Sequence, residues 1–305
     1  MPLAPLKSPP GHLGRSLLAV PFVAAGFGSL LVLNVAQVAS LLLVPFSRPA
    51  YRRFNAAIAN LWWGGCVLTA EIVWGFRLVL TGDDVPEDEN VLIVANHQQM
   101  PDITTLMTWA RSKGRLGDLK FFVKHALKWV PGIGWGMQFL SCPFLRRDWT
   151  RDRRRVEQTF HTLVAERIPM WLVSFAEGTR VTEAKVEASN AWAREQGLAT
   201  TRHVLLPRTK GFVATLDGLG DHLDAVYDVT IGYVDGVPTL WQFITGAVRR
   251  VHVHVRRFRL RDLPADADAR KAWLLDLFYD KDALLDTYYR TGTFPDTVEL
   301  AESVA

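Results

Sequence analysis

Cysteine is scarce in this sequence, whose 305 residues contain only Cys66 and Cys142. Two cysteines so far apart form neither a metal-binding spacing nor a disulfide framework, which excludes a zinc finger and a disulfide-stapled secreted domain. The Gly-x-Ser-x-Gly turn that carries the serine of α/β-hydrolases is missing, and neither cysteine lies near a histidine in a nucleophile motif. A covalent enzyme intermediate is therefore not expected.

Charged residues are missing from the whole of 16–47, a run dominated by leucine, valine, alanine and phenylalanine. The run exceeds the ~20 apolar residues that span a bilayer core. A signal peptide is not favoured, because the run is too long and no convincing cleavage site follows it. Pro21, Gly26 and Gly28 can interrupt a helix, so the run predicts either one tilted span or a helix pair that enters the membrane and returns.

A second apolar stretch, Phe54–Phe76, holds Trp62, Trp63 and Trp74 but is interrupted by Glu71. It predicts either an interfacial helix with tryptophan at headgroup depth or a core helix of the domain that follows. The chain as a whole has 11 tryptophans, a net charge of +4 and a mean hydropathy of +0.08. This combination favours membrane lipids and anionic groups such as phosphate as partners. No nucleic-acid-binding motif is present, so nucleic acid is not an expected partner.

Beyond Arg77, strand-length apolar runs alternate with segments of helical spacing. The expected strands are Phe76–Thr81, Val91–Ala95, Leu119–Lys124, Met170–Phe175, Val226–Val234 and Val251–Arg256. The expected helices are Ile103–Lys113, Arg151–Glu166, Thr182–Glu195, Lys210–Leu216 and Asp268–Tyr289. This alternation predicts an α/β fold with a largely parallel central sheet flanked by helices, preceded by an N-terminal hydrophobic, membrane-associated helical segment. The expected divisions are a membrane-anchoring region at 1–75, a catalytic domain at 76–290 and a tail at 291–305.

The strand Val91–Ala95 runs directly into a polar loop that carries His97 and, five positions later, Asp102. Pro101 disfavours helix at the residue before it, so a helix can begin near Asp102 and bring the carboxylate to the imidazole. A carboxylate in that place fixes the tautomer of the ring and stabilises the imidazolium. The pair predicts a general base that activates a hydroxyl; a structural histidine bonded to a nearby aspartate is the alternative.

Three further blocks carry groups that suit a phosphate. In Glu177-Gly178-Thr179-Arg180, the glycine permits close backbone approach, the threonine offers a hydroxyl and the arginine a planar fork. Arg146 and Arg147 follow a short apolar segment in the same way. In Pro207-Arg208-Thr209-Lys210-Gly211, the proline fixes a turn, and a helix that starts there presents its amides to negative charge.

Taken together, the four blocks resemble those of the glycerolipid acyltransferases, the family of 1-acylglycerol-3-phosphate (lysophosphatidate) acyltransferases. The resemblance covers about residues 76–255 and rests on the order and separation of the His-x4-Asp, Phe-Leu-Arg-Arg, Glu-Gly-Thr-Arg and Pro-Arg-Thr-Lys-Gly blocks. Asn96-His97-Gln98 and the segment 241–246 look most like the branch of YihG-type and lysocardiolipin-acyltransferase-like proteins. Gln99 and Ala176 depart from the common pattern, which has serine or threonine at the first position and proline at the second.

The resemblance implies that His97 takes the proton from the sn-2 hydroxyl of 1-acylglycerol-3-phosphate, that Asp102 orients the ring, and that phosphatidate is formed. The acyl donor that it implies is acyl-CoA or acyl-carrier protein, with no cofactor and no metal. The implied substrate-binding residues are Lys124, Arg146, Arg147, Glu177, Gly178, Thr179, Arg180, Pro207, Lys210 and Gly211.

Two other functions stay open. One is acylation of a different lysophospholipid, such as lysocardiolipin or lysophosphatidylglycerol, and the other is a non-catalytic membrane lipid-binding protein of the same fold. The expected location is the bacterial inner (cytoplasmic) membrane, with the catalytic domain on the cytoplasmic side, for which the basic flanks of the apolar run give a slight bias. His252 and His254 share one face of a predicted strand, and we expect them to be partly exposed structural residues rather than metal ligands.

Overall fold

The computed structural model describes residues 5–7, 12–146 and 149–295. Its helices are α1 (His12–Ala39), α2 (Arg48–Leu68), α3 (Pro101–Ser112), α4 (Ile133–Phe139), α5 (Trp149–Ala165), α6 (Glu183–Glu195), α7 (Thr209–Leu219), α8 (Leu240–Ile244) and α9 (Ala267–Thr291). Its strands are β1 (Arg77–Gly82), β2 (Val91–Ala95), β3 (Leu119–Phe121), β4 (Val123–Lys124), β5 (Phe144–Leu145), β6 (Trp171–Ser174), β7 (Ala225–Gly232) and β8 (Arg250–Arg259).

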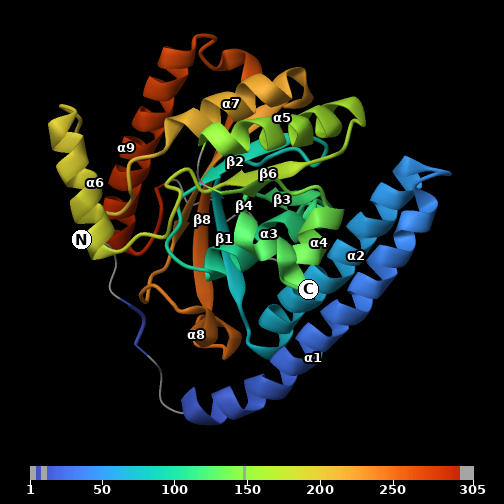
Figure 1. Cartoon of the computed structure of the whole chain (residues 1–305). Helices are drawn as coiled ribbons and strands as arrows, with labels where there is room; N and C mark the ends of the chain where they lie inside the picture. The colour runs from blue at the N-terminus through green and yellow to red at the C-terminus, as the bar shows by residue number, and fades with distance from the viewer. Residues whose placement is uncertain (1–4, 8–11, 147–148, 296–305) are drawn as a thin grey trace.

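A six-stranded sheet in the order β1-β8-β7-β2-β6-β3 runs through the middle of the molecule (Figure 1). Neighbouring strands are parallel except β7 and β8, which pair antiparallel. The strands β2, β3, β6 and β7 therefore all end at one edge of the sheet. Loops at the carboxyl ends of parallel strands are the usual place for a ligand site in α/β folds, and this edge carries the His97 loop.

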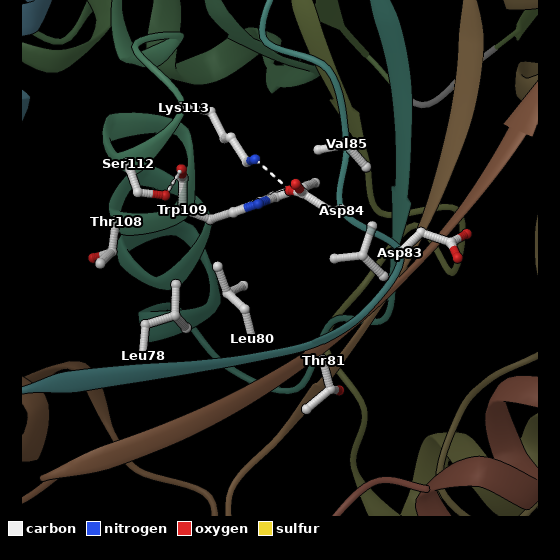
Figure 2. Close-up of a pocket in the computed structure, with 11 residues that line it drawn as sticks. Leu78, Leu80, Thr81, Asp83, Asp84, Val85, Thr108, Trp109, Ser112 and Lys113 are labelled. Carbon is white, nitrogen blue, oxygen red and sulfur yellow. Dashed lines mark hydrogen bonds and ion pairs between the residues drawn. The ribbon is translucent and has the colours of Figure 1, made fainter. Parts of the chain in front are cut away.

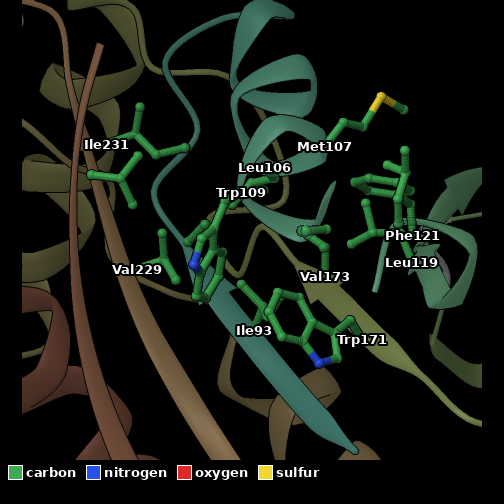
Figure 3. Close-up of a cluster of buried hydrophobic side chains, with 14 of the residues drawn as sticks. Ile93, Leu106, Met107, Trp109, Leu119, Phe121, Trp171, Val173, Val229 and Ile231 are labelled. Atoms are coloured by element: carbon green, nitrogen blue, oxygen red, sulfur yellow. The ribbon is translucent and has the colours of Figure 1, made fainter. Parts of the chain in front are cut away.

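Helices cover both faces of the sheet, which explains why all five residues of β2 are apolar and buried. Ile93 faces a cluster formed with α2 and α3, whereas Leu92 and Val94 face a cluster formed with α5, α7 and α9. Figure 3 shows the first cluster, in which the rings of Trp109 and Trp171 lie 4.8 Å apart between α3 and the sheet. The two cores hold the central strands, and so the loops at their ends, in fixed positions.

The helices α1 and α2 form a hairpin along one side of the molecule (Figure 1). Both are long and apolar enough to cross a membrane by length and composition. Of the two alternatives for the apolar run, the structure has the single helix: α1 continues through Pro21, Gly26 and Gly28, and the chain turns back only after residue 43. Trp62 of α2 donates a hydrogen bond to the carbonyl of Gly26, which fixes the two helices side by side.

The hairpin is fastened to the rest of the chain along its whole length. The contacts are Trp241 Nε1 to Ser16 Oγ (3.1 Å), Gly132 N to Asn34 Oδ1 (2.9 Å) and Arg52 Nε to Glu166 Oε2 (3.1 Å). One face of α2 also enters the first core cluster through Trp63, whereas Leu61 is 65% exposed. The stretch 54–76 thus supplies a core helix with an apolar outer face.

Two expectations about local structure are wrong. The run Leu119–Lys124 forms two short strands in different sheets, because β3 pairs with β6 whereas β4 pairs with β5. His252 is 5% exposed and packs against the ring of Tyr288, because α9 covers that face of β8. His254 is partly exposed, as expected.

Candidate active site

His97 and Asp102 form a hydrogen-bonded pair at the carboxyl end of β2. The distance from His97 Nδ1 to Asp102 Oδ2 is 2.9 Å, and the imidazole side chain is 13% exposed. The pair forms because β2 ends at Ala95 and α3 begins at Pro101, which places the carboxylate in the first helical turn beside the loop. Among the residues that the structure describes, none hydrogen-bonds to His97 Nε2, so that nitrogen is available to a substrate.

The Asp102 carboxylate is fully buried and accepts four hydrogen bonds. Besides the imidazole, the backbone amides of Gln98 and Gln99 bond to Oδ2 at 2.7 and 2.9 Å, and the hydroxyl of Tyr233 bonds to Oδ1 at 2.6 Å. Tyr233 follows β7 directly, so two neighbouring strands supply the partners of this carboxylate. Because the carboxylate acts as the acceptor in these contacts, the imidazole nitrogen that faces it, Nδ1, carries the proton of the ring.

The His97 loop is held by its neighbours in the sequence. The Asn96 side chain exchanges two hydrogen bonds with the backbone of Ile231 on β7, at 3.0 and 2.8 Å. Gln98 Nε2 also donates to the Ile231 carbonyl and is bonded to the hydroxyl of Tyr289 on α9. The imidazole itself stacks on the ring of Phe175 with centroids 4.0 Å apart. The loop is therefore preorganised before any substrate arrives.

Glu177 lies beneath this loop, at the end of β6. It is 2% exposed, and its Oε1 accepts a hydrogen bond of 3.3 Å from the backbone amide of His97. Burial raises the pKa of the Glu177 carboxyl well above its ordinary value, which favours the neutral form. In this position Glu177 steadies the backbone of His97.

Arg180 lies next to the histidine loop. Its Nη1 donates to Oε1 of Gln99, and the backbone amide of Val181 donates to the carbonyl of His97 at 2.9 Å. The hydroxyl of Thr179 accepts from Lys185 Nζ at 2.7 Å. The structure thus joins the first and third sequence blocks, and Arg180 places a guanidinium beside the His97 loop.

The Pro207–Gly211 block packs against the same segment. The backbone amide of Arg208 donates to the carbonyl of Ala176 at 2.8 Å. Gly178 has a φ of +72°, and a Cβ there would lie 2.8 Å from Arg208 Nε, so only glycine fits. Pro207 is buried, whereas Lys210 is exposed in the first turn of α7 with Gly211 beside it.

The second block lies on the small sheet that follows β3. Lys124 of β4 pairs in register with Leu145 of β5, so Lys124 and Arg146 are close neighbours, and both are exposed. Arg146 Nη2 lies 3.4 Å from His125 Nε2. Arg147 lies outside the described residues. Among the described residues, no hydrogen bond or ion pair joins this block to His97, so the structure does not bring Lys124 and Arg146 into direct contact with the pair.

The sequence reasoning missed Tyr233, Phe175, Gln99 and Tyr289. Gln99 carried a signal, since it stood out as a departure from the resembled pattern. Tyr233 and Phe175 closed predicted strands, where a side chain is rigidly aimed, but nothing in the sequence placed them beside His97. Tyr289 lies almost 200 residues away on α9, and only the fold brings it to Gln98.

A cavity of about 310 Å³ lies between the edge strand β1 and the second half of α3. Figure 2 shows its apolar wall of Leu78, Leu80 and Val85, with Lys113 paired to Asp84 at 2.6 Å. Its α3 residues begin at Thr108, roughly 9 Å along the helix from Asp102. Its lining includes none of the predicted site residues.

Comparison with known proteins decides the family. The family model described as "Acyltransferase" matches residues 77–234, and the model described as "Acyltransferase C-terminus" matches 242–303. The chain belongs to the acyltransferase family.

Two relatives show how far the similarity extends. The chain is 35% identical over 295 residues to 1-acyl-sn-glycerol-3-phosphate acyltransferase 2 of Brassica napus, covering 92% of this chain and 74% of the relative. It is 36% identical over 289 residues to 1-acyl-sn-glycerol-3-phosphate acyltransferase delta of Homo sapiens, covering 90% and 73%. The crystal structure of the LPA acyltransferase PlsC from Thermotoga maritima matches with a TM-score of 0.53 at 17% identity, covering 90% of this acyltransferase chain and 95% of that one.

These findings confirm the family resemblance and the α/β fold of this acyltransferase. The YihG-type branch is not tested and stays a prediction. The domain limits and the roles of the individual site residues likewise stay predictions.

Proposed function

We propose that this chain is a lysophosphatidate acyltransferase, which transfers an acyl group from a thioester to the sn-2 hydroxyl of 1-acylglycerol-3-phosphate and forms phosphatidate. Family membership and the activities after which relatives at 35% and 36% identity are named support this reaction. The observation that carries the mechanism is the His97–Asp102 pair. A buried carboxylate is bonded to Nδ1, and no described residue forms a hydrogen bond to Nε2.

In this mechanism His97 Nε2 removes the proton from the sn-2 hydroxyl while the oxygen attacks the thioester carbonyl. The new carbon–oxygen bond gives a tetrahedral intermediate, and its collapse breaks the carbon–sulfur bond. The imidazolium then returns its proton to the leaving thiolate. Asp102 stays ionised throughout and stabilises the imidazolium, while Phe175 holds the plane of the ring.

The cations near the base bind the phosphate of the acceptor in this proposal. Arg180 is held beside the histidine loop by its hydrogen bond to Gln99, and Lys124 with Arg146 forms a second positive group on the small β4–β5 sheet. A guanidinium matches two phosphate oxygens at once, so Arg180 is the residue that orients the glycerol phosphate. Arg147 and Lys210 complete the set, whereas Glu177, Gly178, Thr179, Pro207 and Gly211 shape the backbone around it.

The proposed enzyme works at a membrane, to which α1 and α2 present their exposed apolar faces. Acyl-CoA or acyl-carrier protein is the proposed donor, and rates with each donor at matched concentration distinguish the two. The bacterial inner membrane, with the catalytic domain on its cytoplasmic side, remains our prediction of the location.

The test is His97→Ala in the full-length protein. We expect the rate of phosphatidate formation to fall by about 10³-fold or more, because a positioned general base contributes about 10²–10⁴-fold. Binding to vesicles should be unchanged. His161→Ala, on the exposed face of α5, is the matched control and should keep full activity. Full activity of His97→Ala would refute the mechanism.

A panel of lysolipid acceptors tests the substrate. With one labelled acyl-CoA, we expect lysophosphatidate to be used at least tenfold faster than lysophosphatidylglycerol or lysocardiolipin. A preference for either of those would keep the chemistry and change the acceptor. Failure to form a product with every lysolipid and both donors would leave the non-catalytic lipid-binding function.

A further inference from the structure

An exposed apolar surface lies on the segment that joins β4 to α4, outside the α1–α2 hairpin. It consists of five large side chains that are each more than a third exposed, and we call it the α4 lip. Its members and exposures are Leu127 (41%), Trp129 (73%), Val130 (39%), Ile133 (46%) and Trp135 (39%). Contiguous exposed apolar side chains on this scale mark a binding surface rather than ordinary scatter.

The α4 lip is continuous with the outer face of α1. A Cβ on Gly132, within the lip segment, would lie 3.1 Å from Leu30 and 3.3 Å from the ring of Phe27. Phe27 is itself 46% exposed, and Val32 and Val35 farther along the same helix are about 70% exposed. The polar side chains at the α1–α4 contact, Asn34 and Gln37, are buried at 1% and 2% exposure, so the exposed apolar face of the hairpin continues onto the catalytic domain.

Cations flank the α4 lip. Lys128 Nζ lies 5.7 Å from the ring centroid of Trp129, and Lys124 is exposed just before the lip begins. Arg146 is exposed beside Lys124 on the neighbouring strand. Tryptophan next to lysine or arginine is the composition that sits at the headgroup level of a bilayer, with the rings in the interface and the cations on anionic lipid.

The α4 lip is connected along the chain to the edge of the sheet that carries His97. It follows β3 and β4, and β3 ends at the same edge as β2, whose next residues carry His97. Met100, three residues beyond His97, is 37% exposed there. A surface that holds the lip at headgroup depth therefore holds the base at that depth as well.

We infer that the α4 lip is a second membrane-contacting surface, which inserts into the interface of an anionic bilayer and sets the depth of the catalytic edge. The inference deepens the proposed function, because it supposes that the acceptor of His97 chemistry is drawn from that bilayer. Continuity with α1, the two exposed tryptophans and the flanking cations favour a lipid surface over a protein partner.

The test compares Trp129→Ser/Trp135→Ser with the unchanged protein and with Trp192→Ser. Trp192 is 49% exposed on α6, which Figure 1 places on the other side of the molecule from α4, so it is a matched control. Binding is measured by flotation with phosphatidylcholine vesicles that do or do not contain phosphatidylglycerol. Acyl transfer is measured on lysophosphatidate in those vesicles and on a short-chain lysophosphatidate dissolved as monomers.

We expect the double variant to bind the anionic vesicles about tenfold more weakly and to lose a similar factor in rate on vesicles, since two large apolar side chains leave the interface. The rate on monomeric substrate should stay within about twofold of the unchanged protein. A further variant, Lys128→Gln, should lose binding only to the vesicles that contain phosphatidylglycerol.

Three outcomes would overturn the inference. Unchanged binding and rate on vesicles would show that the α4 lip does not touch lipid. A raised KM for acyl-CoA with monomeric acceptor would show that the lip holds the donor's acyl chain instead. Loss of a dimer in the double variant would assign the lip to a second copy of the chain. Absence of acyl transfer in the unchanged protein would refute the proposed function alone, because the flotation result stands without it.

Discussion

At the scale of single residues, the site depends on one carboxylate that accepts four hydrogen bonds, three of them on Oδ2. Asp102 accepts from an imidazole, two backbone amides and a tyrosine hydroxyl. Asp102→Asn would turn an amide NH2 toward one set of these donors and disturb the tautomer of His97. We expect kcat to fall by about 10²–10⁴-fold with KM nearly unchanged, measured by steady-state kinetics. Tyr233→Phe removes only one donor and should lose far less.

Gln99 is one of the two residues that depart from the pattern the chain resembles, and it accepts a hydrogen bond from Arg180. Gln99→Ser is too short to reach the guanidinium, which then loses its fixed position. We expect KM for lysophosphatidate to rise about three- to tenfold with a smaller change in kcat, because the lost interaction acts on acceptor binding. Gln99→Glu keeps the length of the side chain and is the control. Its carboxylate still reaches Arg180, but the negative charge competes with the phosphate for the guanidinium. A KM for Gln99→Ser equal to that of the unchanged enzyme would contradict this role.

Glu177 gives the protein a pH-dependent stability of predictable sign. Because its pKa is raised in the folded state, the fold keeps a proton that the unfolded chain releases above about pH 4.5. The contribution of Glu177 to the free energy of unfolding is fully present below that pH, and it is lost as the pH rises through the folded-state pKa. Glu177→Gln should reduce this fall of the free energy of unfolding with rising pH, as measured by denaturant unfolding at a series of pH values. Glu183→Gln, which is exposed on α6, should leave the decline unchanged.

At the scale of elements, the sequence predicted the strands and helices of the catalytic domain well, because its strands are buried on both faces and its helices have clear apolar stripes. Val91–Ala95 was predicted to the residue, whereas Leu119–Lys124 was not, since nothing local in six residues reveals a change of pairing partner. The His97–Asp102 contact was also predictable, because both residues lie on one short loop. The partners that follow β7 and lie on α9, Tyr233 and Tyr289, were not predictable, since they depend on the order of the strands in the sheet and on the packing of α9.

Helix α9 is fixed to the sheet by a buried lysine. Lys281 is fully buried and donates to Asp228, to the carbonyl of Val229 and to the hydroxyl of Thr230. Burial lowers the pKa of Lys281, and the carboxylate of Asp228 opposes that shift. Lys281→Met leaves the buried carboxylate of Asp228 with Arg256 as its one remaining charged partner among the described residues.

We expect this substitution to lower the free energy of unfolding by about 3 kcal/mol in a urea titration. Lys271→Met is the matched control on the same helix, since Lys271 pairs with an exposed Asp268 and should lose less than about 1 kcal/mol. Equal losses for the two variants would show that burial of Lys281 has no energetic consequence.

At the scale of the whole molecule, the hairpin lies along the catalytic domain rather than projecting from it, since its start, middle and turn are each bonded to that domain. A protease site can be inserted before α1. We expect this site and the catalytic domain to be cleaved from the same side of sealed membrane vesicles. Vesicles of the opposite orientation should protect both. Protection of only one of the two would mean that α1 crosses the bilayer alone.

Because the hairpin lies along the catalytic domain, it affects how the lipid acceptor reaches the site and how the lipid product leaves it. An enzyme adsorbed lengthwise meets its acceptor by two-dimensional diffusion within a leaflet, and the diacyl product departs the same way without passing through water. Its velocity should follow the mole fraction of lysolipid in the leaflet, so that adding more bilayer of constant composition to fully adsorbed enzyme leaves the turnover rate unchanged.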